Sequence, residues 1–277
     1  MNCKGKIIHF DTPKIMGILN ITEHSFYEGG TYFNNPDKYL FHVETMLKEG
    51  ADIIDVGCMA TNPQAKELSE QEELNNMGTV LNHIISHFSD VIFSIDTYRS
   101  SVAQMAIEMG AAMINDISGG EFDEKMFAVI ARLQVPYILT HTSDKPEMMQ
   151  QKTDYKDVVN DVFLYLSKKL ETLHLLGVND VIIDPGFGFG KTISQNYNLL
   201  NNLQIFKELG CPILVGLSRK SMLYSLLEIS PKQALNATTV ANTIALLHGA
   251  TILRVHDVKE ACEAVKIVSY ISKKNYG

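Results

Sequence analysis

The sequence has few cysteines, few prolines and no long apolar run. Its four cysteines stand singly, without a CxxC pair, which argues against a disulfide framework and favours a reducing cytoplasm. The eight prolines are scattered, and no linker-like tract divides the 277 residues, so we expect one domain spanning residues 1–277. Because no stretch of about 18 uncharged apolar residues occurs, we expect no membrane span. The first residues, MNCKGKIIHFDTPK, lack a basic segment followed by a long apolar run and a small-residue cleavage site, so we do not expect export.

Basic residues are also scarce relative to acidic ones. The chain has 24 Lys and Arg against 32 Asp and Glu, a net charge of −8, whereas a nucleic-acid or anionic-membrane partner favours the opposite balance. The nine histidines include no HExxH pair, and GxSxG is absent, so neither a protein-held catalytic zinc nor an acyl-enzyme is expected. Small molecules remain as partners.

The glycine-rich segment IDPGFGFGKT, residues 183–192, fails two nucleotide-binding patterns. A P-loop requires Gly at the position of Pro185, and a dinucleotide-binding turn requires GxGxxG where this chain has GxGxG. What remains is a carboxylate, Asp184, followed by glycines that let the backbone approach a flat ligand closely. Phe187 and Phe189 could form the walls of such a slot.

Eight short apolar runs alternate with segments of helical periodicity. This pattern predicts parallel strands covered by helices, and the chain length favours a closed (β/α)8 TIM barrel. A doubly wound open sheet is the alternative, because strand number is uncertain from sequence. The runs are KIMGILN (14–20), DIIDVG (52–57), VIFSID (91–96), AMINDI (112–117), VPYILTH (135–141), DVIIDPG (180–186), PILVGLS (212–218) and TILRVH (251–256).

Polar side chains occur where each predicted strand ends. In a TIM barrel these ends meet at one rim, which carries the active site. The alternative is that loops simply begin with polar residues. The side chains are Asn20, Asp55, Asp96, Asn115, Asp116, His141, Asp184, Ser218, Arg254 and His256.

Two groups of these residues indicate different ligand chemistry. Asp96, Asn115 and Asp184 suit a heterocycle with adjacent N–H donors and a carbonyl, because Asp only accepts hydrogen bonds whereas Asn also donates. Capping of the following helices by Asp96 and Asn115 is equally compatible with their spacing. A cationic group at the ends of the last two strands predicts an anion site, although single members could form structural ion pairs. That group is Arg219, Lys220, Arg254 and His256.

Taken together, these motifs resemble dihydropteroate synthases, a pterin-binding family of folate biosynthesis. The matching segments run nearly end to end in the same order. They are GILNIT…SFYEGG (17–30), GADIIDVG…T.P (50–63), IDTYRS.VA (95–103), INDISGG (114–120), H…P..MQ (141–150), IIDPGFGFGKT (182–192), LVGLSRKS (214–221) and ILRVHDV.E (252–260).

The resemblance implies condensation of 6-hydroxymethyl-7,8-dihydropterin diphosphate with p-aminobenzoate, giving dihydropteroate and diphosphate. It also implies Mg²⁺ held by the substrate diphosphate and Asn20, a homodimer formed through the last helices (260–274), and inhibition by sulfonamides. The implied pterin contacts are Asp96, Asn115, Asp184, Phe189, Gly216 and Lys220. The implied diphosphate contacts are Asn20, Thr61, Arg254 and His256. The implied aminobenzoate contacts are Phe26, Thr61, Pro63, Ser218, Arg219 and Ser221.

The implied chemistry agrees with the residue types. If diphosphate departs before the amine attacks, positive charge grows on the pterin methylene and negative charge on the leaving group. Asp96 suits the first, and Arg254, His256 and Mg²⁺ suit the second. We expect Asp96, Lys220, Arg254 and His256 to be catalytic, in an SN1-like reaction without a protein nucleophile.

Two loops depart from the family pattern. Glu23 and His24 stand where the family favours Pro and Asp, and Gly-Glu-Ser-Thr-Arg-Pro-Gly is replaced by a different string. Because an acid and a base are lost together, we expect a reorganised loop. We expect it to weaken diphosphate or aminobenzoate handling, or to alter the sulfonamide response, while the pterin slot stays intact. The replacing residues are Cys58, Met59, Ala60, Thr61, Asn62, Pro63 and Gln64, and Thr140 and Thr142 flank His141 where Met is usual.

Two other functions remain open. A pterin-binding paralogue with little synthase turnover would explain the altered loops. A related methyltransferase, using a reduced folate and a corrinoid partner, is disfavoured by the SRKS segment at 218–221.

Overall fold

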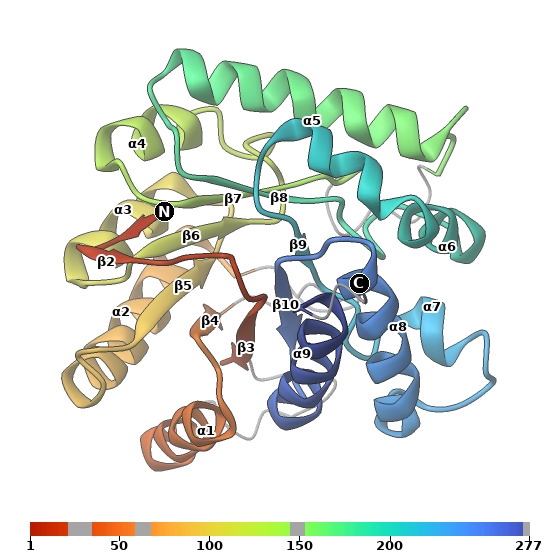
Figure 1. Cartoon of the computed structure of the whole chain (residues 1–277). Coiled ribbons are helices and arrows are strands. Elements are labelled where there is room, and N and C mark those ends of the chain that lie inside the picture. Colours follow the sequence, from red (N-terminus) through yellow and green to blue (C-terminus); the bar gives the residue numbers. More distant parts are fainter. Residues whose placement is uncertain (22–34, 59–67, 145–152, 274–277) are drawn as a thin grey trace.

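Eight parallel strands form a barrel surrounded by helices in this computed structural model, which describes residues 1–21, 35–58, 68–144 and 153–273 (Figure 1). Neighbours follow the order β8-β7-β6-β5-β4-β3-β10-β9, and a parallel bridge between Ile183 and Ile213 joins the two ends. The TIM-barrel prediction is confirmed, and the open sheet is excluded. The strands are β3 (Lys14–Asn20), β4 (Ile53–Gly57), β5 (Ile92–Asp96), β6 (Met113–Asp116), β7 (Tyr137–Thr140), β8 (Val181–Asp184), β9 (Leu214–Val215) and β10 (Ile252–Val255).

The helices pack their apolar faces against the outside of the sheet. Ser69 begins α2 with a reciprocal capping box to Glu72, and Gly50 ends α1 in the left-handed conformation. The helices are α1 (Pro36–Glu49), α2 (Glu70–His87), α3 (Ser100–Met109), α4 (Met126–Leu133), α5 (Val158–Leu175), α6 (Ile193–Asn201), α7 (Ser221–Tyr224), α8 (Leu235–Leu247) and α9 (Val258–Lys273), with 3₁₀ turns at Leu203–Leu209 and Pro231–Gln233. In the part of the chain that the structure describes, no helix is long and apolar enough to cross a membrane.

At the amino ends of the strands, the barrel interior is closed by apolar side chains. An N-terminal hairpin, β1 (Asn2–Cys3) with β2 (Lys6–Ile7), brings Cys3 and Ile8 into contact with the inward-facing residues there. Burial raises the pKa of the Cys3 thiol to about 11, so this cysteine is an inert packing residue. The other buried residues of this apolar cluster are Met16, Ile53, Ala112, Met113, Ile138, Ile182, Leu214 and Ile252.

Toward the carboxyl ends of the strands, the same interior is polar. Side chains alternate along a strand, so the residue two positions after each apolar one points into the same space. Ile53 is thus followed by Asp55, Met113 by Asn115, and Ile182 by Asp184. The barrel therefore holds an apolar floor under a polar well that opens at the carboxyl ends of the strands.

Candidate active site

Arg254 lies at the centre of the polar well, between two carboxylates. Its Nε donates to Asp55 Oδ2 and its Nη2 to Asp96 Oδ2, each over 2.6 Å. Asn115 Nδ2 donates to the same Asp55 oxygen over 2.9 Å. This network joins β10 to β4, β5 and β6, and it fixes the guanidinium at the base of the well.

The network also excludes helix capping as the role of Asp96 and Asn115. No side chain caps α3 at Arg99, and the Ser100 amide donates instead to Asp123 over 2.7 Å. Burial raises the pKa of Asp96 to about 7, although the adjacent Arg254 opposes that rise. Both side chains thus face a ligand space rather than a helix terminus.

Asp184 and Lys220 form the opposite side of the well. Asp184 Oδ1 accepts from the Gly186 amide over 2.8 Å, and burial raises the pKa of this carboxyl although Lys220 opposes the rise. Lys220 Nζ donates to the Phe187 carbonyl and lies 4.5 Å from the centroid of the Phe189 ring. Burial lowers the pKa of Lys220 to about 8. At neutral pH this side chain is therefore mainly cationic.

Toward the carboxyl ends of the barrel strands, three buried oxygen atoms have no hydrogen-bond partner among the described residues: Asp55 Oδ1, Ser94 Oγ and Thr140 Oγ1. The strand register places Ser94 beside Asp55 and Thr140 beside Asp184. Because buried polar atoms are almost always paired, such atoms indicate where a polar ligand or ordered water binds. The well is thus built to receive a molecule with several hydrogen-bonding groups.

The remaining described residues of the predicted site lie around this well. His256 donates its backbone N–H to Ser218 Oγ over 3.2 Å, and burial lowers the pKa of the His256 imidazole to about 4. A side chain at Gly57 would contact both Asn20 Oδ1 and Asp96 Cβ at 3.4 Å, which places the Asn20 amide at the mouth of the well. Gly216 leaves space beside Arg254, whose Cβ is the nearest atom to a side chain built there, at 3.9 Å.

Known proteins are similar to this chain in fold and in sequence. The pterin binding enzyme family matches residues 16–256. The dihydropteroate synthase of Clostridium beijerinckii is 41% identical over 94% of both chains. That of Escherichia coli K12 is 38% identical over 96% of this chain and 94% of its own.

Two solved structures agree with these relatives. The dihydropteroate synthase of Yersinia pestis in complex with a sulfonamide drug has a TM-score of 0.94 at 37% identity, covering 99% of both chains. That of Xanthomonas albilineans in complex with 7,8-dihydropteroate has a TM-score of 0.87 at 32% identity, covering 99% of this chain and 98% of its own. This chain belongs to the dihydropteroate synthase family. The recognition made from its motifs is confirmed.

The aminobenzoate contacts that this family resemblance implied are only partly visible. Arg219 has a left-handed backbone with φ of 55°, and its guanidinium grips Asp257 at 2.9 and 2.8 Å while also donating to the carbonyls of Pro231 and Lys232. Ser221 is exposed at the start of α7. Three predicted members of the site lie outside the described residues: Phe26, Thr61 and Pro63. The residues that depart from the family pattern at Glu23, His24, Met59, Ala60, Asn62 and Gln64 also lie outside them.

Sequence reasoning left two polar residues of this dihydropteroate synthase fold without a role. Asp55 was noted at a strand end, but its partnership with Arg254 joins positions 199 residues apart. Lys191 lies in the segment that fails the P-loop pattern and received no role from the sequence, yet it is 4% exposed and its Nζ has three hydrogen-bond partners. The usable signal for Lys191 was a lysine directly after a glycine-rich turn.

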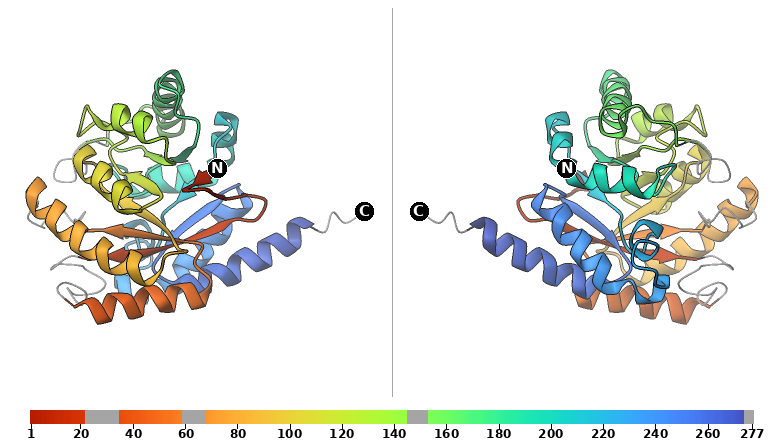
Figure 2. Two further views of the ribbon diagram at one scale, coloured as in Figure 1. Left: turned by 90° about the vertical axis from the view of Figure 1, so that its left-hand side faces the viewer. Right: turned by 90° about the vertical axis from the view of Figure 1, so that its right-hand side faces the viewer.

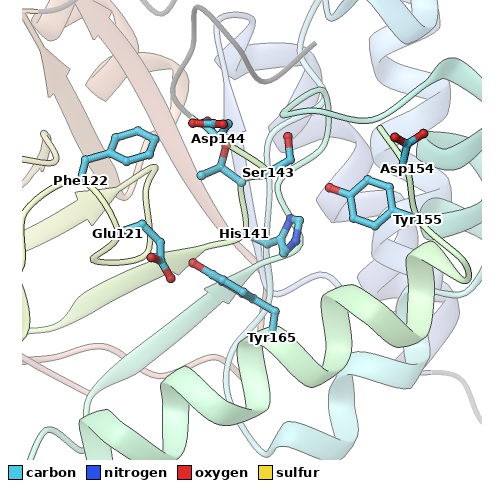
Figure 3. A pocket seen from close by; sticks show the side chains of 9 residues that line it. Glu121, Phe122, His141, Ser143, Asp144, Asp154, Tyr155 and Tyr165 are labelled. Carbon is cyan, nitrogen blue, oxygen red and sulfur yellow. Dashed lines mark hydrogen bonds between the residues drawn. The ribbon is translucent and has the colours of Figure 1, made fainter. Parts of the chain in front are cut away.

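A further cavity of about 770 Å³ adjoins the carboxyl end of β7 (Figure 3). Among the residues that the structure describes, none of the predicted pterin, diphosphate or aminobenzoate contacts lines it. His141 is its most buried polar side chain, at 5% exposure, and Tyr155 and Tyr165 flank the imidazole. The other lining residues are Glu121, Phe122, Thr142, Ser143, Asp144 and Asp154.

Proposed function

We propose that this protein is a dihydropteroate synthase, which joins 6-hydroxymethyl-7,8-dihydropterin diphosphate to p-aminobenzoate with release of diphosphate in folate biosynthesis. The carrying observation is the polar well, in which Asp96, Asn115, Asp184 and Lys220 surround orphaned buried oxygens. The membership of the family supports this assignment over the full length of the barrel.

The polar well suits the pterin ring. The carboxylates of Asp96 and Asp184 accept from ring N–H groups, and Asn115 can serve a neighbouring donor or acceptor. Phe189 and the space left at Gly216 admit a flat ring system. Lys220 is positioned near Asp184 to donate to a ring acceptor.

Departure of the diphosphate is assisted by groups at the other side of the well. Arg254 stays protonated because Asp55 and Asp96 raise its pKa against the effect of burial. His256, with its lowered pKa, is neutral at pH 7 and acts there as a hydrogen-bonding group rather than as a cation. The Asp96 carboxylate stabilises positive charge that develops on the pterin methylene. Together these groups support SN1-like chemistry through preorganised charge.

The residues at the mouth of the well fit a bound Mg²⁺. This ion favours oxygen ligands and is commonly held by a few protein oxygens together with substrate phosphates. Asn20 offers its amide oxygen beside Asp96, and the described residues contain no cluster of three or more His, Cys, Asp or Glu that could hold a metal ion alone. Asn20 would hold the ion, which neutralises charge on the diphosphate.

The aminobenzoate site follows at the rim. Ser218, Arg219 and Ser221 lie there, and Phe26, Thr61 and Pro63 complete the proposed set. Because Arg219 already grips Asp257, we assign it the shaping of the rim through the segment that contains Pro231 and Lys232. Sulfonamides are proposed to compete at this subsite, and the altered loop residues are expected to change the response to them.

A homodimer through α8 and α9 is proposed as the assembly. These helices pack on one another and expose several large apolar side chains, and α9 extends past the barrel (Figure 2). Clustered exposed apolar residues are typical of subunit interfaces. The residues are Val240, Ile244, Leu247, Ile267, Tyr270 and Ile271. A cytoplasmic location remains a prediction from the sequence.

One assay tests the proposed activity. Purified protein with the pterin diphosphate, Mg²⁺ and p-aminobenzoate should release diphosphate and form dihydropteroate only when both organic substrates are present. Asp96→Asn is the matched inactive variant, since it preserves shape but removes the charge. Pterin binding without diphosphate release would instead identify a binding paralogue.

A further inference from the structure

Lys191 is a buried lysine whose hydrogen-bond partners are not carboxylates, and burial lowers its pKa well below the usual value. Its Nζ donates to the Gly186 carbonyl over 2.8 Å, the Phe189 carbonyl over 3.0 Å and His141 Nδ1 over 2.9 Å. Within the described residues, no carboxylate forms an ion pair with this ammonium. An ammonium has three N–H donors, so the three acceptors satisfy it completely.

The two carbonyls belong to the turn that also contacts Lys220. Gly186 has a φ of +71°, and a side chain there would lie 1.8 Å from the His141 carbonyl oxygen. The Gly188 amide donates to Asn196 Oδ1 over 2.7 Å. Lys220 holds the intervening Phe187 carbonyl from the interior side. Three carbonyls of the turn are thus held by lysines, those of Gly186 and Phe189 by Lys191 and that of Phe187 by Lys220.

His141 is prepared to act as the third acceptor. Its ring packs edge-on against Tyr165 with centroids 4.8 Å apart, and it lies 5.9 Å from the Tyr155 ring (Figure 3). Burial, with a smaller effect from the nearby Lys191, lowers the pKa of His141 well below its usual value. The imidazole is therefore neutral, which leaves Nδ1 free to accept a hydrogen bond.

We propose that Lys191 is a positioning residue, which with His141 as its third acceptor fixes the 186–190 turn so that Phe189 and the Lys220 ammonium face the pterin. This inference deepens the proposed function, because it concerns the same well. A buried lysine with only backbone and imidazole acceptors is costly to desolvate. The hydrogen bonds that offset this cost hold the carbonyls of the turn in a single arrangement.

The first test replaces Lys191 by Met, which preserves length and apolar packing. We expect the KM for the pterin diphosphate to rise at least tenfold and the KM for aminobenzoate to change less than threefold. Amide hydrogen exchange in residues 186–190 should accelerate while that of β3 to β6 stays unchanged. Lys6→Met, at an exposed pair with Asp90, is the control and should match the wild type.

The second test uses His141, in case the first variant fails to fold. His141→Asn keeps an acceptor for Lys191, whereas His141→Leu removes it. We expect Asn to restore most of the pterin affinity that Leu loses, measured as the Kd of 6-hydroxymethylpterin by calorimetry. Equal Kd values for the two variants, or unchanged exchange of the turn in Lys191→Met, would overturn the proposal.

The hydrogen-exchange and pterin-binding measurements do not depend on turnover. If the wild type binds pterin but forms no dihydropteroate, the proposed synthase activity fails while the positioning role is still decided by these two readouts.

Discussion

Two kinds of cation site lie toward the carboxyl ends of the barrel strands. Arg254 is held by the carboxylates of Asp55 and Asp96, which keep it charged. Lys191 and Lys220 are held mainly by backbone carbonyls, and burial lowers the pKa of both. The carboxylate-held site supplies a permanent charge, whereas the carbonyl-held site supplies a charge that depends on pH and on the shape of one turn.

The largest effect is expected at the carboxylate-held site. Arg254→Met leaves two buried carboxylates without their cation, which should lower the free energy of unfolding by about 3 kcal/mol and kcat by at least about a hundredfold. Unfolding in urea and steady-state kinetics measure the two losses.

The pH dependence of this loss of stability follows from the ionisation of the buried carboxylates. Burial already raises the pKa of Asp96 and Arg254 opposes that rise. Without Arg254 the folded pKa of Asp96 rises further, so the stability deficit is largest at high pH and shrinks as acid protonates this carboxylate. Arg132→Met, which removes only an exposed bond to Gln104, is the control. Equal losses in the two variants would remove the distinction drawn between the sites.

A smaller effect is expected from pH at the carbonyl-held site. Because burial lowers the pKa of Lys220 to about 8, kcat/KM for the pterin diphosphate should fall about tenfold per pH unit above that value. Lys220→Arg should displace this alkaline limb to higher pH even if its activity is lower. His256, with a pKa of about 4, should produce no transition near pH 6.5. A limb that stays near pH 8 in Lys220→Arg would assign it to another group.

The smallest effect is expected at the ring beneath Lys220. Phe189→Leu removes the aromatic face 4.5 Å from Nζ, which is worth about 1 kcal/mol and should raise the KM for the pterin diphosphate roughly fivefold. Phe122→Leu, in the cavity outside the barrel wall, should leave that KM unchanged. A wild-type KM in Phe189→Leu would show that this contact does not support binding.

The barrel could be predicted because its signal is local and repeated. Each strand shows its own apolar run, and eight runs in alternation with helical segments determine the fold class. Strand length was less predictable: β9 covers only Leu214–Val215 of the predicted 212–218. The later residues of that run leave the sheet for the turn at Arg219, whose left-handed backbone has no signature in SRKS.

The site was predictable as a set of polar strand ends but not as a network. Asp96 and Asn115 were ambiguous between capping and ligand binding, since their partners lie on distant strands. Arg219 and Lys220 are adjacent and similar in sequence, but they point to different partners, Asp257 and the Phe187 carbonyl. Such choices depend on the turn between them and on residues far along the chain.

The joint between β8 and β9 has the fewest paired residues of any two neighbouring strands in the barrel. A single bridge at Ile183 and Ile213 closes the sheet there, whereas β3 and β4 pair over five residues. The turn held by Lys191 begins three residues after this joint, at Gly186. The hydrogen bonds of Lys191 therefore hold the chain just beyond the place where the barrel sheet has its fewest backbone pairings.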